Sequence, residues 1–167
     1  MPLSLLRIDD RLIHGQVVVG WVAALKADYI IVINDAAAKN EMQKCMLKLA
    51  VPPNLSVSIF SVEEFNLKND SKEFSQHNVI ILVTNPGDIV RIMEKGFKVN
   101  EVNLGGMRHA LNKKEFTKCI FLDDNDINNF KKLQSLKVKV NVRMVPADKA
   151  QDLFECFLKG YCKIEED

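Results

Sequence analysis

The sequence predicts one α/β domain, a three-layer sandwich with a mainly parallel, doubly wound central sheet of about six or seven strands and helices on both faces. Two observations predict this fold class. Short β-rich runs alternate with single helical patterns, as in βα units. Several runs, such as Tyr29-Ile30-Ile31-Val32-Ile33, are continuously apolar, which strands covered on both faces require. No repeat or Gly/Ser-rich linker divides residues 1–167, so we expect a single domain.

The expected strands are short runs of β-branched and aliphatic residues between polar or turn-forming residues. They lie at Leu3–Ile8, Tyr29–Asn34, Leu55–Phe60, Val79–Val83, Glu101–Leu104, Cys119–Leu122 and Val138–Val145. Because helical patterns lie between them, we expect these strands to share one sheet.

The expected helices are identified by their start signals. Ser61 and Glu64 have capping-box spacing, which predicts a helix directly after the strand ending at Phe60. Asn85-Pro86 is a cap followed by proline in the first turn, and it opens a helix over Gly87–Lys95. Three further helices are expected: one after the loop Asp9–Gly15, one capped by Asp123 or Asp124 and running through Leu136, and one introduced by Pro146–Asp148 and ending near Leu158.

The segment Asn40–Leu49 also has a helical pattern. Met42, Cys45, Met46 and Leu49 follow one another at spacings of three and four residues, which places them in one apolar stripe. We expect this stripe to pack into the core rather than to bind a cofactor.

Composition excludes several function classes. The net charge of +1 supplies no field for nucleic acid or an anionic membrane. The longest nearly apolar run, Val17–Leu25, is shorter than the roughly 20 residues that span a bilayer. The N-terminus has no export signal, and the four cysteines form no CxxC pair, which favours free thiols and no zinc site. A cytoplasmic, metal-free domain is therefore expected.

Ligands of parallel sheets bind at the carboxyl ends of the strands, near the point where the strand order reverses. The loops at that edge contain no G-x-G-x-x-G, no G-x-x-x-x-G-K-[ST] and no G-x-S-x-G pattern. Dinucleotide binding, P-loop chemistry and serine hydrolysis are therefore disfavoured.

The first loop concentrates chemically useful side chains between a strand and a helix. It reads Arg7-Ile8-Asp9-Asp10-Arg11-Leu12-Ile13-His14-Gly15-Gln16. A histidine near pH 7 is mostly a neutral nucleophile, and Arg11 offers a planar fork for phosphate oxygens. Gly15 would allow a bound group to approach the backbone at a helix start that attracts anions. Either Asp9 or Asp10 could fix the imidazole tautomer or pair with Arg11.

Other candidates lie elsewhere on the chain. Gly105-Gly106 is expected to form a tight turn that could line a phosphoryl pocket. Asp35 could orient the first loop or simply start the second loop, and Ser61 could pack beside His14, although its helix-capping role already explains it. His77 precedes a strand and so belongs to the opposite edge of the sheet. His109 is expected to be an exposed loop residue or a bystander near the site.

Several segments of the chain also resemble one protein family. The stretch Arg7–Val17 closely resembles the start of the IIB component of mannose/fructose/sorbose-type sugar phosphotransferase systems. The likeness continues, in order, through Val32–Asp35, Leu47–Pro52, Ser58–Val62, Asn103–Arg108 and Val142–Asp148.

The resemblance implies a phosphocarrier, a phosphotransferase with an alcohol group as acceptor. His14 would accept a phosphoryl group from a IIA phosphohistidine, on the ring nitrogen nearer the backbone, and pass it to a sugar imported through IIC and IID. Arg11, with Gly15 and Asp10, would bind the phosphoryl group, and Asp9, Asp35, Ser61, Gly105 and Gly106 could line the site. The transfer needs no nucleotide, and arginine with backbone dipoles can replace a metal, so no cofactor is expected.

The same resemblance also implies which partners the protein has and where it is located. With no IIA-like segment in this sequence, the donor is expected to be a separate polypeptide, and the chain to associate with the inner face of the membrane through IIC/IID. Scattered apolar surface is compatible with a homodimer.

Two other classes of protein share some of these features. A signalling receiver domain also has an acidic pair after its first strand, but it needs an aspartate where this chain has Phe60-Ser61 and a lysine where it has Gly105-Gly106. A binding module without chemistry would bind its ligand without His14 and would form no phosphoprotein.

Overall fold

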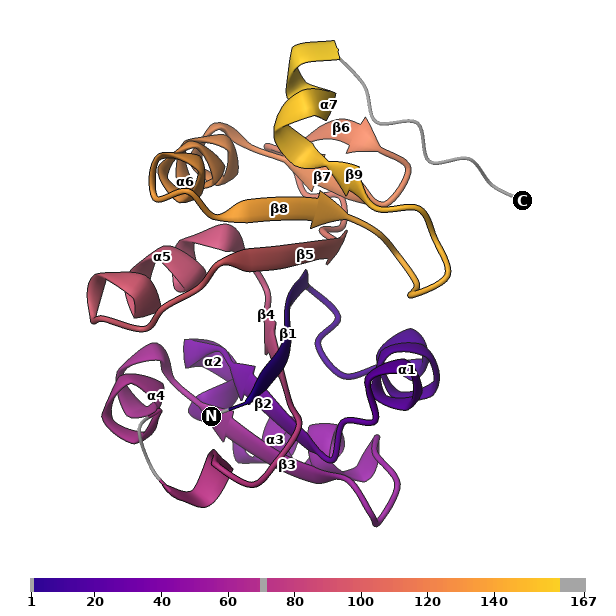
Figure 1. The fold of residues 1–167 in the computed structure, drawn as a ribbon, viewed down its shortest axis with the longest axis vertical. Coiled ribbons are helices and arrows are strands. Elements are labelled where there is room, and N and C mark those ends of the chain that lie inside the picture. Colours follow the sequence, from indigo (N-terminus) through magenta and orange to yellow (C-terminus); the bar gives the residue numbers. More distant parts are fainter. Residues whose placement is uncertain (1, 70–71, 160–167) are drawn as a thin grey trace.

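The computed structural model describes residues 2–69 and 72–159. A seven-stranded sheet in the order β3-β2-β4-β1-β5-β8-β9 runs through the molecule between two layers of helices (Figure 1). Its strands are β1 (Leu3–Asp9), β2 (Tyr29–Ile33), β3 (Ser56–Phe60), β4 (Val79–Val83), β5 (Glu101–Gly106), β8 (Lys139–Val142) and β9 (Gln151–Asp152). All pairings are parallel except that of β8 with β9. The predicted three-layer α/β class is confirmed.

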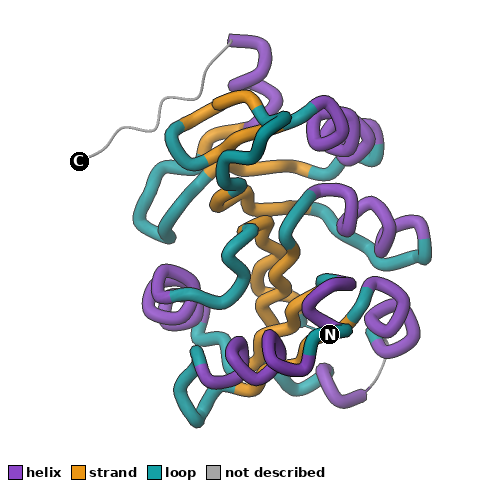
Figure 2. Tube along the Cα trace, turned by 180° about the vertical axis from the view of Figure 1, so that it is seen from behind, coloured by secondary structure: helices purple, strands orange, loops and turns teal. Residues whose placement is uncertain are grey.

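The helices divide between the two faces of the sheet, as the tube view from behind also shows (Figure 2). One face carries the π-helix η1 (Gln16–Val22), its continuation α1 (Ala23–Leu25), α2 (Asp35–Ala38) and α3 (Glu41–Leu49). The other carries α4 (Val62–Lys68), α5 (Pro86–Glu94), α6 (Asp124–Ser135) and α7 (Leu153–Lys159), with the short 3₁₀ turn η2 (Lys72–Phe74). None of the helices in the described ranges is long and apolar enough to cross a membrane.

Successive side chains of each strand point to opposite faces of the sheet and pack against the two helical layers in turn. In β2, Ile30 and Val32 pack with the η1 side, whereas Ile31 and Ile33 pack with the α5 side. All four are fully buried. The continuously apolar runs of the sequence are therefore the doubly covered strands that they predict.

The helix start signals are confirmed where a side chain caps the backbone. Ser61 and Glu64 form a reciprocal capping box at α4, and Asp123 with Asp126 forms another at α6. Asn85 caps α5, with Pro86 at its first position. Such caps stabilise a helix by about 1 kcal/mol each.

The expectation for the α3 stripe was wrong. Met42, Met46 and Leu49 are 76%, 65% and 79% exposed, and Cys45 is also exposed. Leu47 is the buried residue of this helix and packs among the side chains of α2 and the neighbouring strands. A short helix at the side of the edge strand β3 meets the protein on one narrow face, and the turn from α2 decides which face that is.

Two other expectations, for one strand and one helix, need correction. The run Cys119–Leu122 does form a strand, β7 (Ile120–Leu122), but it pairs antiparallel with β6 (Lys114–Thr117) outside the main sheet. The last helix begins at Leu153 rather than near Pro146, because Asp148 accepts hydrogen bonds from the backbone of Met144 and Val145 and closes a loop there.

The cysteines also differ in part from expectation. Cys45 and Cys119 are free thiols, whereas Cys156 is disulfide-bonded. Cys162 and the rest of the tail after residue 159 lie outside the described residues.

Candidate functional site

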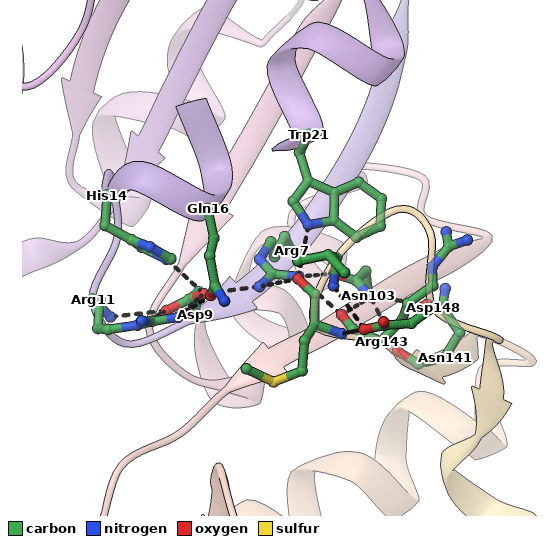
Figure 3. Close-up of polar contacts among 12 residues, drawn as sticks. Arg7, Asp9, Arg11, His14, Gln16, Trp21, Asn103, Asn141, Arg143 and Asp148 are labelled. Atoms are coloured by element: carbon green, nitrogen blue, oxygen red, sulfur yellow. Dashed lines mark hydrogen bonds and ion pairs between the residues drawn. The ribbon is translucent and has the colours of Figure 1, made fainter. Parts of the chain in front are cut away.

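The first loop follows β1 at the topological switch point, where the strand order of the sheet reverses. The connection after β1 leads toward β2 on one side, while the connection after β5 leads toward β8 on the other. β1 and β5 are neighbours, so their carboxyl ends flank this switch point, where α/β sheets place their ligands. Figure 3 shows the polar side chains that gather there.

Asp9, the last residue of β1, is the centre of the cluster. Its side chain is fully buried and accepts hydrogen bonds from Arg7 Nη2 at 3.0 Å, from His14 Nε2 at 2.9 Å and from Arg11 Nε at 3.2 Å. Burial by itself would raise the pKa of Asp9, but the hydrogen bond from His14, the charge of Arg7 and the contacts with Arg11 lower it to about 2. The carboxylate is therefore ionised at neutral pH.

This contact determines the chemistry of the imidazole. An ionised carboxylate can only accept hydrogen bonds, so the Nε2 atom of His14 carries the proton that faces Asp9. In a neutral ring the other nitrogen, Nδ1, then keeps its lone pair. His14 is 17% exposed at the side chain, so the ring combines a fixed tautomer with access from solvent.

Arg11 lies at the rim of the same cluster. Its side chain is 36% exposed, and it donates to Asp9 and, through Nη2, to Gln16 Oε1 at 2.9 Å. Gly15 precedes η1, and a methyl group placed on its Cα would meet no atom within 4 Å, so the space above it is open. The first N–H groups of a helix have no partner inside it and can meet an anion.

Of the two aspartates in the first loop, Asp9 is the one that contacts the imidazole. Asp9 contacts both His14 and Arg11, whereas Asp10 accepts from the backbone N–H and Nε of Arg108 at 3.0 and 2.9 Å. Asp10 therefore ties the first loop to the segment that follows β5. It has no direct contact with the imidazole among the described residues.

Gly105 and Gly106 correct the expected turn, because both lie within β5. A Cβ atom on Gly105 would stand 1.9 Å from Arg7 Cζ, so this glycine makes room for a buried guanidinium. Gly106 borders the Asp9 carboxylate, at 3.7 Å from a Cβ placed there, and its carbonyl accepts from Asp10 N.

Asp35 and Ser61 are held by helix ends rather than by the first loop. Asp35 accepts from Val62 N at 2.9 Å and pairs with Arg91 at 2.7 Å. Ser61 caps α4. Ser61 thus has its helix-capping role, and Asp35 begins the helix α2 rather than a loop.

The other two histidines lie apart from the cluster. His77 precedes β4 and contacts Asp28 at 2.9 Å, at the amino edge of the sheet as expected. His109 is exposed and lies edge-on to Phe121.

Sequence reasoning missed Arg7 and Asn103. Both are buried, in the neighbouring strands β1 and β5, and Arg7 donates to Asn103 Oδ1 and to the carbonyls of Arg143 and Met144. An arginine inside an otherwise apolar strand was the available signal, because a buried charge needs built partners.

Comparisons with known proteins show which family the chain resembles. A family profile described as "PTS system sorbose subfamily IIB component" matches residues 3–167. The chain is 35% identical over 155 residues to the sorbose-specific EIIB component of Klebsiella pneumoniae, covering 93% of this chain and 94% of that protein. It is also 35% identical to the fructose-specific EIIB component of Bacillus subtilis, covering 93% and 95%.

The solved structures and a fused relative extend the comparison. The IIBSor domain of the sorbose permease from Klebsiella pneumoniae matches with a TM-score of 0.90 at 34% identity, covering 95% of this chain and 98% of that one. The mannose-specific EIIAB component of Escherichia coli K12 is 34% identical over 148 residues, which are 89% of this chain but 46% of that protein. A profile that matches nearly every residue, relatives of the same length and the same fold together show that the chain belongs to the mannose/fructose/sorbose family of phosphotransferase-system IIB components, which are phosphotransferases of sugar import.

Proposed function

We propose that His14 is the phosphoryl carrier of this chain and that its Nδ1 atom is the nucleophile. The observation that supports this assignment is the hydrogen bond between Nε2 and the buried carboxylate of Asp9, at 2.9 Å. It leaves Nδ1 with the free electron pair, and a phosphoryl group needs an in-line nucleophile more than covalent help from the protein.

The neighbouring groups have complementary roles in the proposal. As the N–P bond forms, positive charge develops on the ring, and Asp9 lies against the N–H that carries it. Arg11, half-exposed at the rim, meets the phosphoryl oxygens together with the N–H groups that lead η1 near Gly15.

IIB components work with IIA and with IIC/IID partners, and a mannose-specific relative carries an EIIAB name. For this chain we propose a separate IIA phosphohistidine as donor and a sugar hydroxyl as final acceptor. We further propose a cytoplasmic location at the inner face of the membrane through IIC/IID. The related names include sorbose, fructose, mannose and N-acetylgalactosamine, so the sugar is not assigned.

The test is phosphorylation of the purified protein with phosphoenolpyruvate, the general phosphotransferase proteins and a matching IIA. Intact mass should show one added phosphoryl group that is lost in acid and stable in base. His14→Ala should abolish it, whereas His77→Ala and His109→Ala should retain it, because these rings contact Asp28 and Phe121 rather than Asp9. Labelling that survives in His14→Ala would refute the assignment, and a base-labile group would indicate an acyl phosphate instead.

A further inference from the structure

A continuous chain of hydrogen bonds connects strand β8 with the imidazole. Asn141 on β8 accepts from Asn103 Nδ2 at 2.9 Å, and Asn103 on β5 accepts from Arg7 on β1. Arg7 then donates to Asp9 Oδ2, the same oxygen that His14 Nε2 contacts. The path joins the neighbouring strands β8, β5 and β1 before it reaches the first loop, and its side chains are drawn in Figure 3.

Arg7 is built into this position with little freedom. Its side chain is fully buried, and burial lowers the pKa of its guanidinium although the charge of Asp9 opposes that effect. Its fork also donates to the carbonyls of Arg143 and Met144, at 3.1 Å each. Because Gly105 lacks a side chain, the guanidinium fits against β5.

The two arginines on Asp9 differ in how firmly they can hold it. Arg7 is enclosed and has four acceptors, whereas Arg11 is 36% exposed and shares its donors with Gln16. Arg7 contacts the carboxylate oxygen that faces the ring, Oδ2, at 3.0 Å, and Arg11 Nη2 reaches the same atom at 3.4 Å. Arg11 also donates to the other oxygen, Oδ1, from its backbone N–H and from Nε at 3.2 Å each. Arg7 is therefore the closer of the two arginines to the oxygen that faces His14, whereas Arg11 mainly holds the other oxygen.

We propose that Arg7, oriented by Asn103, is the positioning residue that fixes the Asp9 carboxylate and thereby decides which ring nitrogen of His14 accepts the phosphoryl group. The inference rests on the proposed function and deepens it. With Asp9 fixed, the proton stays on Nε2. The Nδ1 electron pair forms the new N–P bond, the donor's P–N bond breaks, and its electron pair returns to the donor imidazole.

Loosening Asp9 changes the outcome of that step. A carboxylate held only through Oδ1 by Arg11 keeps the proton on Nε2 less firmly, and the ring can then present Nε2 as the nucleophile as well. The phosphoryl group should then appear on both nitrogens. Displacement of a reacting group by about 1 Å also slows such reactions by about 100-fold.

The experiment compares Arg7→Lys and Asn103→Ala with the wild type and with Arg91→Lys. Arg91 is a matched control, because it also bridges two carboxylates, Asp35 and Asp88, but on α5 and without contact with Asp9. Lysine keeps the charge of Arg7 but cannot reach the same acceptors as a planar fork. The site of phosphorylation is read from ¹⁵N resonances of the labelled histidine ring, and transfer from IIA is followed by rapid quench.

Wild type and Arg91→Lys should carry the group on Nδ1 alone. Arg7→Lys and Asn103→Ala should transfer about 10- to 100-fold more slowly and place a measurable fraction on Nε2. If the folded variants carry the phosphoryl group on Nδ1 alone, whatever their rate of transfer, the proposal is overturned. It is also overturned if Arg7→Lys and Asn103→Ala both fail to fold, because the two residues would then have a structural role. A wild type unlabelled at His14 would instead refute the proposed function itself.

Discussion

Replacing Asp9 by asparagine removes a buried carboxylate whose pKa the fold holds at about 2, against an ordinary value of 3.8. Each pKa unit corresponds to about 1.4 kcal/mol of differential interaction, so this carboxylate contributes about 2 kcal/mol of pH-dependent stability. Because the folded-state pKa is the lower one, the contribution is complete above about pH 5. It is lost as the pH falls toward 2.

The assay is urea unfolding at a series of pH values between 5 and 2, followed by tryptophan fluorescence. Trp21 is the single tryptophan, is 2% exposed and donates to Met144 O beside the site, so its emission reports on this region. The free energy of unfolding of the wild type should fall by about 2 kcal/mol more over this range than that of Asp9→Asn.

Other carboxylates whose pKa the fold lowers, such as Asp35, are present in both proteins, so the difference between the two curves isolates Asp9. Asp9→Asn should also be less stable throughout, since the buried Arg7 loses its anion. That loss moves the curve without changing its slope. Parallel curves for the two proteins would refute the reasoning about the ionised, hydrogen-bonded carboxylate.

Three further predictions concern single positions. Arg11→Ala should slow phosphoryl transfer and leave the unfolding free energy within about 1 kcal/mol of wild type, because its contacts lie at a half-exposed rim; unchanged transfer kinetics would remove its proposed role. Gly105→Ala should destabilise the protein by about 3 kcal/mol in urea unfolding, since the new methyl group would overlap the guanidinium of Arg7, whereas Gly15→Ala, with open space, should not; equal stabilities would contradict this packing. Met46→Glu on the exposed face of α3 should change the stability by less than about 0.5 kcal/mol, and a loss above 2 kcal/mol would restore the core interpretation of that stripe.

The sheet could be predicted because its determinants are local. Val79–Val83 has the predicted bounds of its strand, and the caps at Ser61 and Asn85 lie where their spacing indicated. Periodicity failed at α3 because it shows that a helix has an apolar stripe but not whether another element covers it. The strand at Ile120–Leu122 was identified, but its partner depended on a neighbouring segment whose pattern gave no strand signal.

Some residues of the candidate site could likewise be predicted from the sequence, and others could not. Asp9, Arg11 and His14 lie within six residues of one another, so their proximity could be seen in the sequence. Apart from Asp9, the acceptors of Arg7 lie 96 to 137 residues away in the sequence, and only the sheet order brings them together. The choice between Asp9 and Asp10 likewise depended on Arg108, which pairs with the second aspartate and leaves the first for the imidazole.

The conformation of Leu12 indicates that the first loop becomes ordered when the chain folds. Leu12 has a φ of 57°, in the left-handed region that side chains other than glycine seldom occupy, at a cost of about 1 kcal/mol or more. Its side chain is nevertheless 3% exposed and packs with the η1 layer, which anchors the turn between Asp9 and His14. The loop thus loses its conformational entropy once, when the chain folds, and not again each time the imidazole meets a donor or an acceptor.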